Sequence, residues 1–211
     1  MRSQSEINEI ISLLETDYPE AGCSLDYIVP HEMLFSIRLA AQCTDERVNK
    51  ITPVLFSHYP SLEAVAAADI TDVEEIVRPC GYYRAKARDI VLCAKMLIDE
   101  CSGVLPDSME ELLKLPGVGR KTANLILGDI YGQSAVVVDT HCIRLSNRLG
   151  LVENLKDPTK IERKLREILP AEKSNDFCHR LVFHGRAVCT ARRPNCFGCS
   201  LINLCPSATA M

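Results

Sequence analysis

The sequence of 211 residues lacks any long apolar stretch. Its longest candidates, residues 27–34 and 130–138, fall far short of the roughly 18 residues that a helix needs to cross a bilayer. Residues 1–8 also lack the apolar core of a signal peptide. We therefore expect no membrane insertion and a reducing, cytoplasmic compartment.

Strand patterns are equally scarce, because no convincing run of alternating polar and apolar residues is flanked by hairpin turns. Apolar residues recur at helical spacing instead, and Pro or Gly separates the segments. We expect an all-α protein, with Tyr18-Pro19 ending the first helix, Asp45 and Ser61 as caps, and residues 135–138 as a buried extended linker. Further helices are expected at residues 32–41, 46–55, 61–67, 72–77, 84–100, 108–115, 121–131, 140–149 and 158–169.

The chain has no excess of positive charge. A net charge of −4 and a pI near 5.8 do not by themselves indicate a nucleic-acid partner. Acidic residues are, however, absent after Asp176, and Arg180, Arg186, Arg192 and Arg193 all lie in that last segment. A local basic face is therefore expected at the C-terminal end of an otherwise acidic protein.

The same segment contains four cysteines, Cys189, Cys196, Cys199 and Cys205, separated by six, two and five residues. Thiolates that bind zinc or an iron–sulfur cluster need several sulfurs on a tight loop, and the Cys-x-x-Cys step supplies its centre. A disulfide knot is disfavoured because the chain has eleven cysteines, an odd number, and the expected compartment is reducing. The spacing satisfies zinc and a cluster equally well.

A second motif is the sequence Leu-Pro-Gly-Val-Gly-Arg-Lys-Thr-Ala-Asn at residues 115–124, which follows a helix start with a Ser108/Glu111 capping box. Gly117 and Gly119 allow a tight turn that brings backbone amides to the start of the next helix, where an anion is favoured. A DNA phosphate is the natural ligand. A plain connection between two helices is the alternative for this motif alone.

Together with Val-Asp-Thr-His at residues 138–141, Ala-Ala-Gln-Cys-Thr-Asp at 40–45 and residues 79–86, these motifs resemble endonuclease III, a family of helix-hairpin-helix DNA glycosylases with a [4Fe–4S] cluster. The resemblance covers almost the whole chain. It implies a monomer of two lobes with DNA in the groove between them. Residues 22–132 would form a six-helix lobe with the hairpin at 108–131, and residues 1–21 and 133–211 a second lobe with the cluster at 189–205.

The resemblance also implies the chemistry. Lys121 would attack C1′ of a damaged pyrimidine nucleotide in double-stranded DNA, release the base and form an imine, after which β-elimination cuts the strand 3′ to the abasic site. A lysine amine attacks only when neutral, and a helix N-terminus and Arg120 both disfavour the charged form. Asp139 would stabilise the oxocarbenium charge, assist proton transfer and cap the helix that follows. The protein would be nucleoid-associated.

Further DNA contacts are expected from the same resemblance. Gln42 occupies the family's wedge position, where an amide enters the base stack once the nucleotide is extruded. Tyr82 stands where the family usually has an aliphatic residue, so it is a second wedge that stacks on bases or a residue packed within its loop. His141 would line the base pocket, while Arg192 and Arg193 would face phosphates.

Other protein classes are disfavoured. Adenine glycosylases and thymine-mismatch glycosylases of the superfamily lack the lysine that corresponds to Lys121. A non-catalytic DNA-binding module would not need both Lys121 and Asp139. An electron-transfer protein is disfavoured because the four cysteines occupy a short tail on a much larger helical body.

Overall fold

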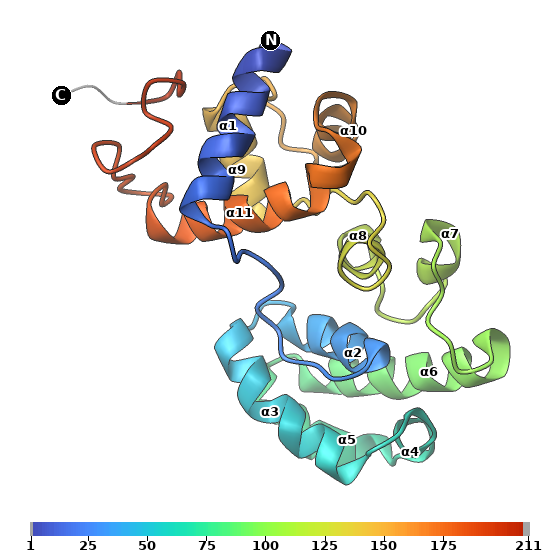
Figure 1. Cartoon of the computed structure of the whole chain (residues 1–211). Helices are drawn as coiled ribbons and strands as arrows, with labels where there is room; N and C mark the ends of the chain where they lie inside the picture. The colour runs from blue at the N-terminus through green and yellow to red at the C-terminus, as the bar shows by residue number, and fades with distance from the viewer. Residues whose placement is uncertain (1, 209–211) are drawn as a thin grey trace. The chain divides into compact units, whose positions relative to one another are not determined.

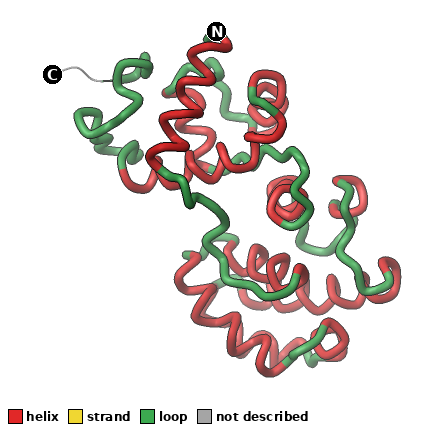
Figure 2. The backbone as a smooth tube through the Cα atoms, viewed as in Figure 1, coloured by secondary structure: helices red, strands yellow, loops and turns green. Residues whose placement is uncertain are grey.

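The structure, a computed structural model, describes residues 2–208 (Figure 1). Within that range every regular element is a helix and no strand is present, so the all-α expectation is confirmed (Figure 2). None of these helices is both long enough and apolar enough to cross a bilayer. The α-helices are α1 Gln4–Asp17, α2 Pro30–Ala40, α3 Asp45–His58, α4 Leu62–Ala67, α5 Ile70–Val77, α6 Tyr83–Cys101, α7 Met109–Leu112, α8 Arg120–Asp129, α9 Thr140–Arg148, α10 Pro158–Ile168 and α11 Ser174–Ala187, with short 3-10 turns η1 Arg78–Cys80 and η2 Ala171–Lys173.

Contacts divide the chain into two compact units. The first, Ser24–Tyr131, contains α2 to α8, and we call it the hairpin unit. The second combines the residues up to Cys23 with those from Gly132 onward, and we call it the terminal unit. Each unit is described by itself below.

In the hairpin unit, α6 is the longest helix, and α2, α4 and α5 pack against it. One face of α6 is buried, because its apolar residues recur every three or four positions. Burying each large aliphatic side chain on such a face contributes about 1.5–3 kcal/mol. Helix α8 contacts both α2 and α7, so α2 packs against the helix that follows the connection between α7 and α8.

In the terminal unit, α11 packs against both α1 and α9 (Figure 1). Residues 135–138 form an extended segment in which every side chain is buried, as expected. That segment leads from the core directly to Asp139 at the start of α9.

The structure corrects several local expectations. Helix α11 was not expected, because its buried residues include the polar side chains of His179, Arg180 and His184, which obscure the apolar pattern. Helix α3 is capped by Thr44, whose hydroxyl accepts from the backbone N–H of Arg47 at 3.4 Å, and Asp45 is its first helical residue. The other corrections are small shifts: α2 begins at Pro30 rather than residue 32, α3 ends at His58 rather than residue 55, α5 begins at Ile70 rather than residue 72, α7 ends at Leu112 rather than residue 115, and α8 spans Arg120–Asp129 rather than residues 121–131.

Candidate functional site

The turn between α7 and α8 lies on a mostly buried ion pair of the hairpin unit. Arg38 of α2 donates from Nε to Asp89 of α6 at 2.9 Å, and its Nη2 lies 2.7 Å from the same oxygen. Gly117 has φ of +75°, and a Cβ there would come within 2.8 Å of Arg38 Nε and 3.0 Å of Asp89 Cβ. Only glycine therefore fits this turn without displacing the ion pair.

Gly119 has a different role from Gly117, because its backbone is extended and nothing lies near the position of a Cβ. It is the N-cap of α8, and its carbonyl accepts the first helical bond, from Ala123 N–H at 2.9 Å. Arg120 and Lys121 are the first two residues of α8, and both are exposed. The hairpin thus presents a primary amine and a guanidinium to solvent at a helix N-terminus, where the helix dipole favours an anion.

Asp139 is the N-cap of α9 in the terminal unit, as expected. Its Oδ1 accepts from the backbone N–H of Cys142 at 2.7 Å. Because this bond uses one carboxylate oxygen and holds the side chain in place, the half-exposed group keeps acceptor capacity for a further partner.

His141 lies in the first turn of α9 and is half-buried against α11. The guanidinium of Arg144 donates to His141 Nδ1 at 3.1 Å and to the carbonyl oxygens of Gly185 and Cys189, each also at 3.1 Å. A Cβ at Gly185 would lie 2.4 Å from His141 Nδ1. The glycine therefore makes room for the imidazole, and Arg144 connects that imidazole to the first residue of the cysteine segment.

Gln42 and Tyr82 lie in two loops of the hairpin unit and share an uncommon backbone. Both are exposed, and both adopt the left-handed conformation, with φ of 55° and 50°. Tyr82 is 69% exposed, so it does not pack within its loop. For residues other than glycine this conformation costs roughly 1–2 kcal/mol, and such strain clusters at functional positions.

The cysteine tail, residues 189–205, has no regular helix but surrounds a cavity of about 180 Å³. All four of its cysteines line this cavity, together with residues that include Leu145, Arg148 and His184. Among the described residues, no three His, Cys, Asp or Glu side chains converge closely enough to hold one metal ion. The four sulfurs are thus arranged around a volume that is larger than a single ion needs.

Side chains of the helices donate to this tail. Arg148 of α9 donates to Cys189 Sγ at 3.2 Å and to the carbonyl oxygens of Thr190 and Ala191 at 2.8 and 2.9 Å. His184 Nε2 of α11 lies 3.5 Å from Cys199 Sγ. Burial lowers the pKa of His184, and it raises the pKa of the Cys199 and Cys205 thiols, which the neighbouring cysteines raise further.

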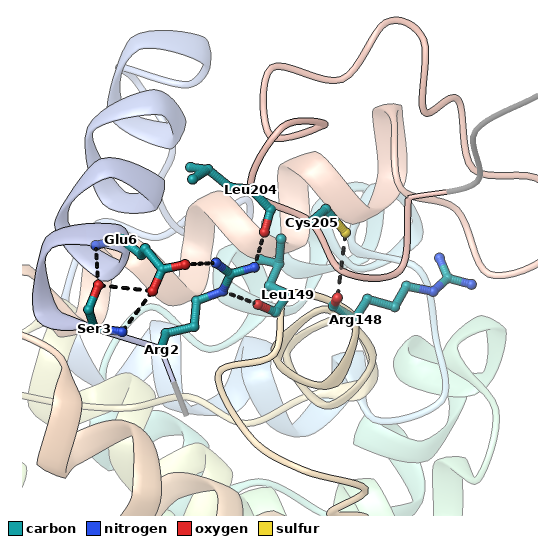
Figure 3. Close-up of polar contacts among 7 residues, drawn as sticks. All are labelled: Arg2, Ser3, Glu6, Arg148, Leu149, Leu204 and Cys205. Atoms are coloured by element: carbon teal, nitrogen blue, oxygen red, sulfur yellow. Dashed lines mark hydrogen bonds and ion pairs between the residues drawn. The ribbon is translucent and has the colours of Figure 1, made fainter.

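The N-terminal residues fasten the far end of the tail, as Figure 3 shows. Arg2 donates to the carbonyl oxygen of Leu149 at 2.6 Å, pairs with Glu6 at 2.7 Å and also donates to the carbonyl of Leu204. Cys205 Sγ lies 3.5 Å from the Arg148 carbonyl oxygen. Hydrogen bonds therefore attach the tail to the segment that precedes α1 and to the end of α9.

Arg192 and Arg193 lie between the first two cysteines and are exposed. The hydroxyl of Thr190 donates to the Arg193 carbonyl at 2.7 Å and accepts from the Arg193 N–H at 3.3 Å. The backbone of this loop is thus closed on itself while both guanidinium groups face solvent.

Comparison with known proteins identifies the family. A profile described as the HhH-GPD superfamily of base excision DNA repair proteins matches residues 35–171. The chain belongs to this superfamily. It is 48% identical over 203 residues to endonuclease III of Synechocystis sp., covering 96% of this chain and 92% of that one. A non-covalent endonuclease III–DNA complex and a trapped endonuclease III–DNA covalent intermediate each superpose with a TM-score of 0.92 at 38% identity, over 99% of this chain and 97% and 98% of theirs.

Three side chains at the candidate site were not predicted from the sequence: those of Arg144, Arg148 and His184. Arg144 and Arg148 stand one helical turn apart after Asp139, and both donate to the start of the tail. That spacing was a usable signal, since residues four apart share one helix face. His184 had no such signal, because the helix that contains it was itself not expected.

Proposed function

We propose that this superfamily member is a bifunctional DNA glycosylase and abasic-site lyase that removes oxidised pyrimidines from double-stranded DNA. The observation that carries the proposal is Lys121, an exposed amine at the N-terminus of α8, in a chain similar throughout to an enzyme whose covalent DNA intermediate has been trapped. Its fixed turn supports this assignment, because a nucleophile must be held in one geometry relative to its target.

In the proposed reaction, the neutral amine of Lys121 forms a bond to C1′, and the glycosidic C1′–N bond breaks as the base leaves with its electron pair and gains a proton. The nitrogen loses a proton, its lone pair forms the C1′=N bond of an imine, and the C1′–O4′ bond breaks, with O4′ taking that electron pair and a proton. The imine acidifies the C2′ protons, and removal of one expels the 3′ phosphate by β-elimination. Water finally hydrolyses the imine and frees the lysine.

Asp139 would stabilise positive charge at C1′ and accept or return a proton. Its fixed orientation supports this role, since a carboxylate held by the backbone of α9 needs little reorganisation when charge develops. Gln42 and Tyr82 would enter the base stack, and His141 would line the pocket for the extruded base. Gly117, Gly119 and Arg120 would hold one phosphate, and Arg192 and Arg193 others.

We further propose that Cys189, Cys196, Cys199 and Cys205 hold one [4Fe–4S] cluster. Four thiols around one cavity, without a three-residue single-ion site among residues 2–208, fit a multi-atom cluster better than zinc. The hydrogen bond that Arg148 donates to Cys189 Sγ suits a sulfur that carries negative charge, and His184 Nε2, 3.5 Å from Cys199 Sγ, would donate to a second such sulfur. When bound, the cluster would cross-link the tail and fix the loop that contains Arg192 and Arg193.

The experiment that tests the proposed reaction is borohydride trapping on a duplex with one thymine glycol. The wild type should form a covalent protein–DNA adduct and Lys121→Ala none, because reduction captures only an imine. Lys114→Ala is the matched control, since Lys114 is an exposed lysine of the same hairpin that pairs with Glu111 at 2.6 Å, and it should retain the adduct.

Absence of the adduct in the wild type, with DNA binding intact, would contradict the lyase and favour a monofunctional or non-catalytic DNA-binding protein. Asp139→Asn adds a second arm, because an amide oxygen still caps α9 but has no charge. Its single-turnover excision rate should fall about 100-fold with little change in melting temperature, whereas Asp139→Ala should also lose about 1 kcal/mol of stability.

A further inference from the structure

The hairpin unit contains a fully buried lysine that the proposed reaction does not use. Lys86 lies in the first turn of α6 and has no exposed surface. Its ammonium donates to the carbonyl oxygens of Leu39 at 2.8 Å and Cys80 at 2.7 Å. Burial lowers the pKa of this amine. Because lysines are almost never fully buried, these two bonds must offset a substantial desolvation cost.

Both carbonyls lie at helix ends. Leu39 is the next-to-last residue of α2, and Cys80 is the last residue of η1. The final carbonyls of a helix have no partner within it, and the end of α2 also has the negative pole of the helix dipole. A cation is therefore well placed there, and a single ammonium joins two segments that are 41 residues apart in the sequence.

The two joined segments are those that present Gln42 and Tyr82. Each of these left-handed, exposed residues follows its Lys86-bound carbonyl by two or three positions. A further contact lies beside them, since Arg47 of α3 donates to the Pro79 carbonyl at 3.3 Å. Burial, followed by the effect of the Cys43 thiol, raises the pKa of Cys80 to about 11. Strained backbone of this kind persists only where its surroundings fix it.

We propose that Lys86 is a positioning residue for nucleotide extrusion, which fixes the loops of Gln42 and Tyr82 at one spacing so that both side chains enter the DNA stack together. This inference rests on the proposed glycosylase function and deepens it. Lys86 touches neither DNA nor the reacting atoms. Its effect is confined to substrates in which a paired nucleotide must be extruded, because filling the vacated space is the step that needs both loops in register.

The test compares thymine glycol in a fully paired duplex with the same lesion in a bubble of unpaired bases, where extrusion costs least. Lys86→Met keeps the length of the side chain and removes its donors. Its single-turnover excision rate should fall about tenfold on the paired duplex and less than about twofold in the bubble. Lys50→Met is the matched control, because Lys50 is an exposed lysine of the same unit that pairs with the exposed Glu46, and it should leave both rates unchanged.

Lys86→Arg, which retains a charged donor, should restore most of the paired-duplex rate. In a Gln42→Ala background, Lys86→Met should slow excision less than it does alone, because the two act on one step. If circular dichroism shows that Lys86→Met does not fold, Lys86→Gln carries the same comparison without the charge.

Equal slowing on both substrates, or no slowing on either, would overturn the positioning role. A wild type that excises from neither substrate would instead reject the proposed function. The two failures are thus distinguishable in one set of reactions.

Discussion

The hairpin turn, residues 113–119, and the cysteine tail both lack regular structure, but the protein fixes them in different ways. The hairpin turn is fixed by exclusion: a glycine lies directly on the Arg38–Asp89 ion pair, and no side chain fits between them. The tail is fixed by hydrogen bonds, because arginines from the N-terminus and from α9 donate to its carbonyl oxygens.

The two loops obtain their stability from different sources. The hairpin is shaped by contacts within the protein, because α2 packs against both α6 and α8 and the turn lies on an ion pair between α2 and α6. The tail instead encloses a cavity lined by four thiols, and burial makes two of those thiols harder to ionise. A bound cation or cluster would reverse that cost by stabilising the thiolates, so under the proposed function the tail would be the loop whose order depends on a cofactor.

The largest effect is expected from the removal of one tail thiol. Cys199→Ser should lower the iron content of the purified protein to about a tenth or less, since cluster ligands are seldom replaceable by a hydroxyl. Cys101→Ser, which changes a half-buried cysteine of the hairpin unit, should keep full iron content. Iron and acid-labile sulfide assays measure both, with ultraviolet and visible absorption as a further readout.

Four outcomes of that measurement are informative. Iron with sulfide in a ratio near one supports the cluster, whereas zinc in the wild type would contradict iron and keep the four-cysteine site. Loss of metal with preserved helical circular dichroism supports a tail that depends on its cofactor. Full iron content in Cys199→Ser would remove Cys199 from the ligand set.

A smaller effect is expected from adding one methyl group to the hairpin turn. Gly117→Ala should lower the free energy of unfolding by about 3 kcal/mol, from a left-handed alanine at about 1 kcal/mol and overpacking against Arg38 and Asp89 at about 2 kcal/mol. Gly132→Ala is the matched control, because Gly132 also has positive φ, +61°, but has no atom within 4 Å of a Cβ. Urea unfolding of both variants measures the difference.

The control separates the cost of overpacking from the cost of the left-handed backbone conformation. If both variants lose the same stability, the turn is fixed by its backbone angles alone and the contact with the ion pair contributes nothing. A greater loss in Gly117→Ala confirms that exclusion shapes the hairpin.

These two loops also show what sequence reasoning captured. The helices were predictable because their apolar residues recur at helical spacing, as on α6, and because caps such as Ser61 and Asp139 mark their starts. Gly117 was recognised as a turn residue, but its contact with Arg38 and Asp89 was not, since those residues come from two distant helices. Long-range contacts of this kind leave no local pattern.

The same reasoning missed polar and charged side chains that are buried. Helix α11 has His179, Arg180 and His184 on buried surface, where a periodicity argument expects apolar residues. Lys86 was overlooked for the same reason, because lysines are ordinarily exposed. Its value as an anchor depends on two carbonyls that only the folded chain brings together.

A smaller effect is expected when the charge of the tail is changed but its shape is kept. Changing both Arg192 and Arg193 to Gln should leave the iron content and the melting temperature unchanged, since both side chains are exposed and Thr190 holds the loop through backbone groups. Binding to undamaged duplex should become less dependent on salt, with the slope of log K against log salt reduced in magnitude by up to about 2, because each phosphate contact releases close to one counterion.

The matched control removes two charges from the same unit by changing Lys160 and Arg163 of α10, both of which are exposed. If the two double variants alter the slope equally, only the net charge matters, and the tail loop is not a DNA contact. A change confined to the Arg192 and Arg193 variant means that the tail places two charges at phosphates. In that case, loss of the cluster in Cys199→Ser should reduce the slope in the same way, because a loop without its cross-link no longer holds those charges in register.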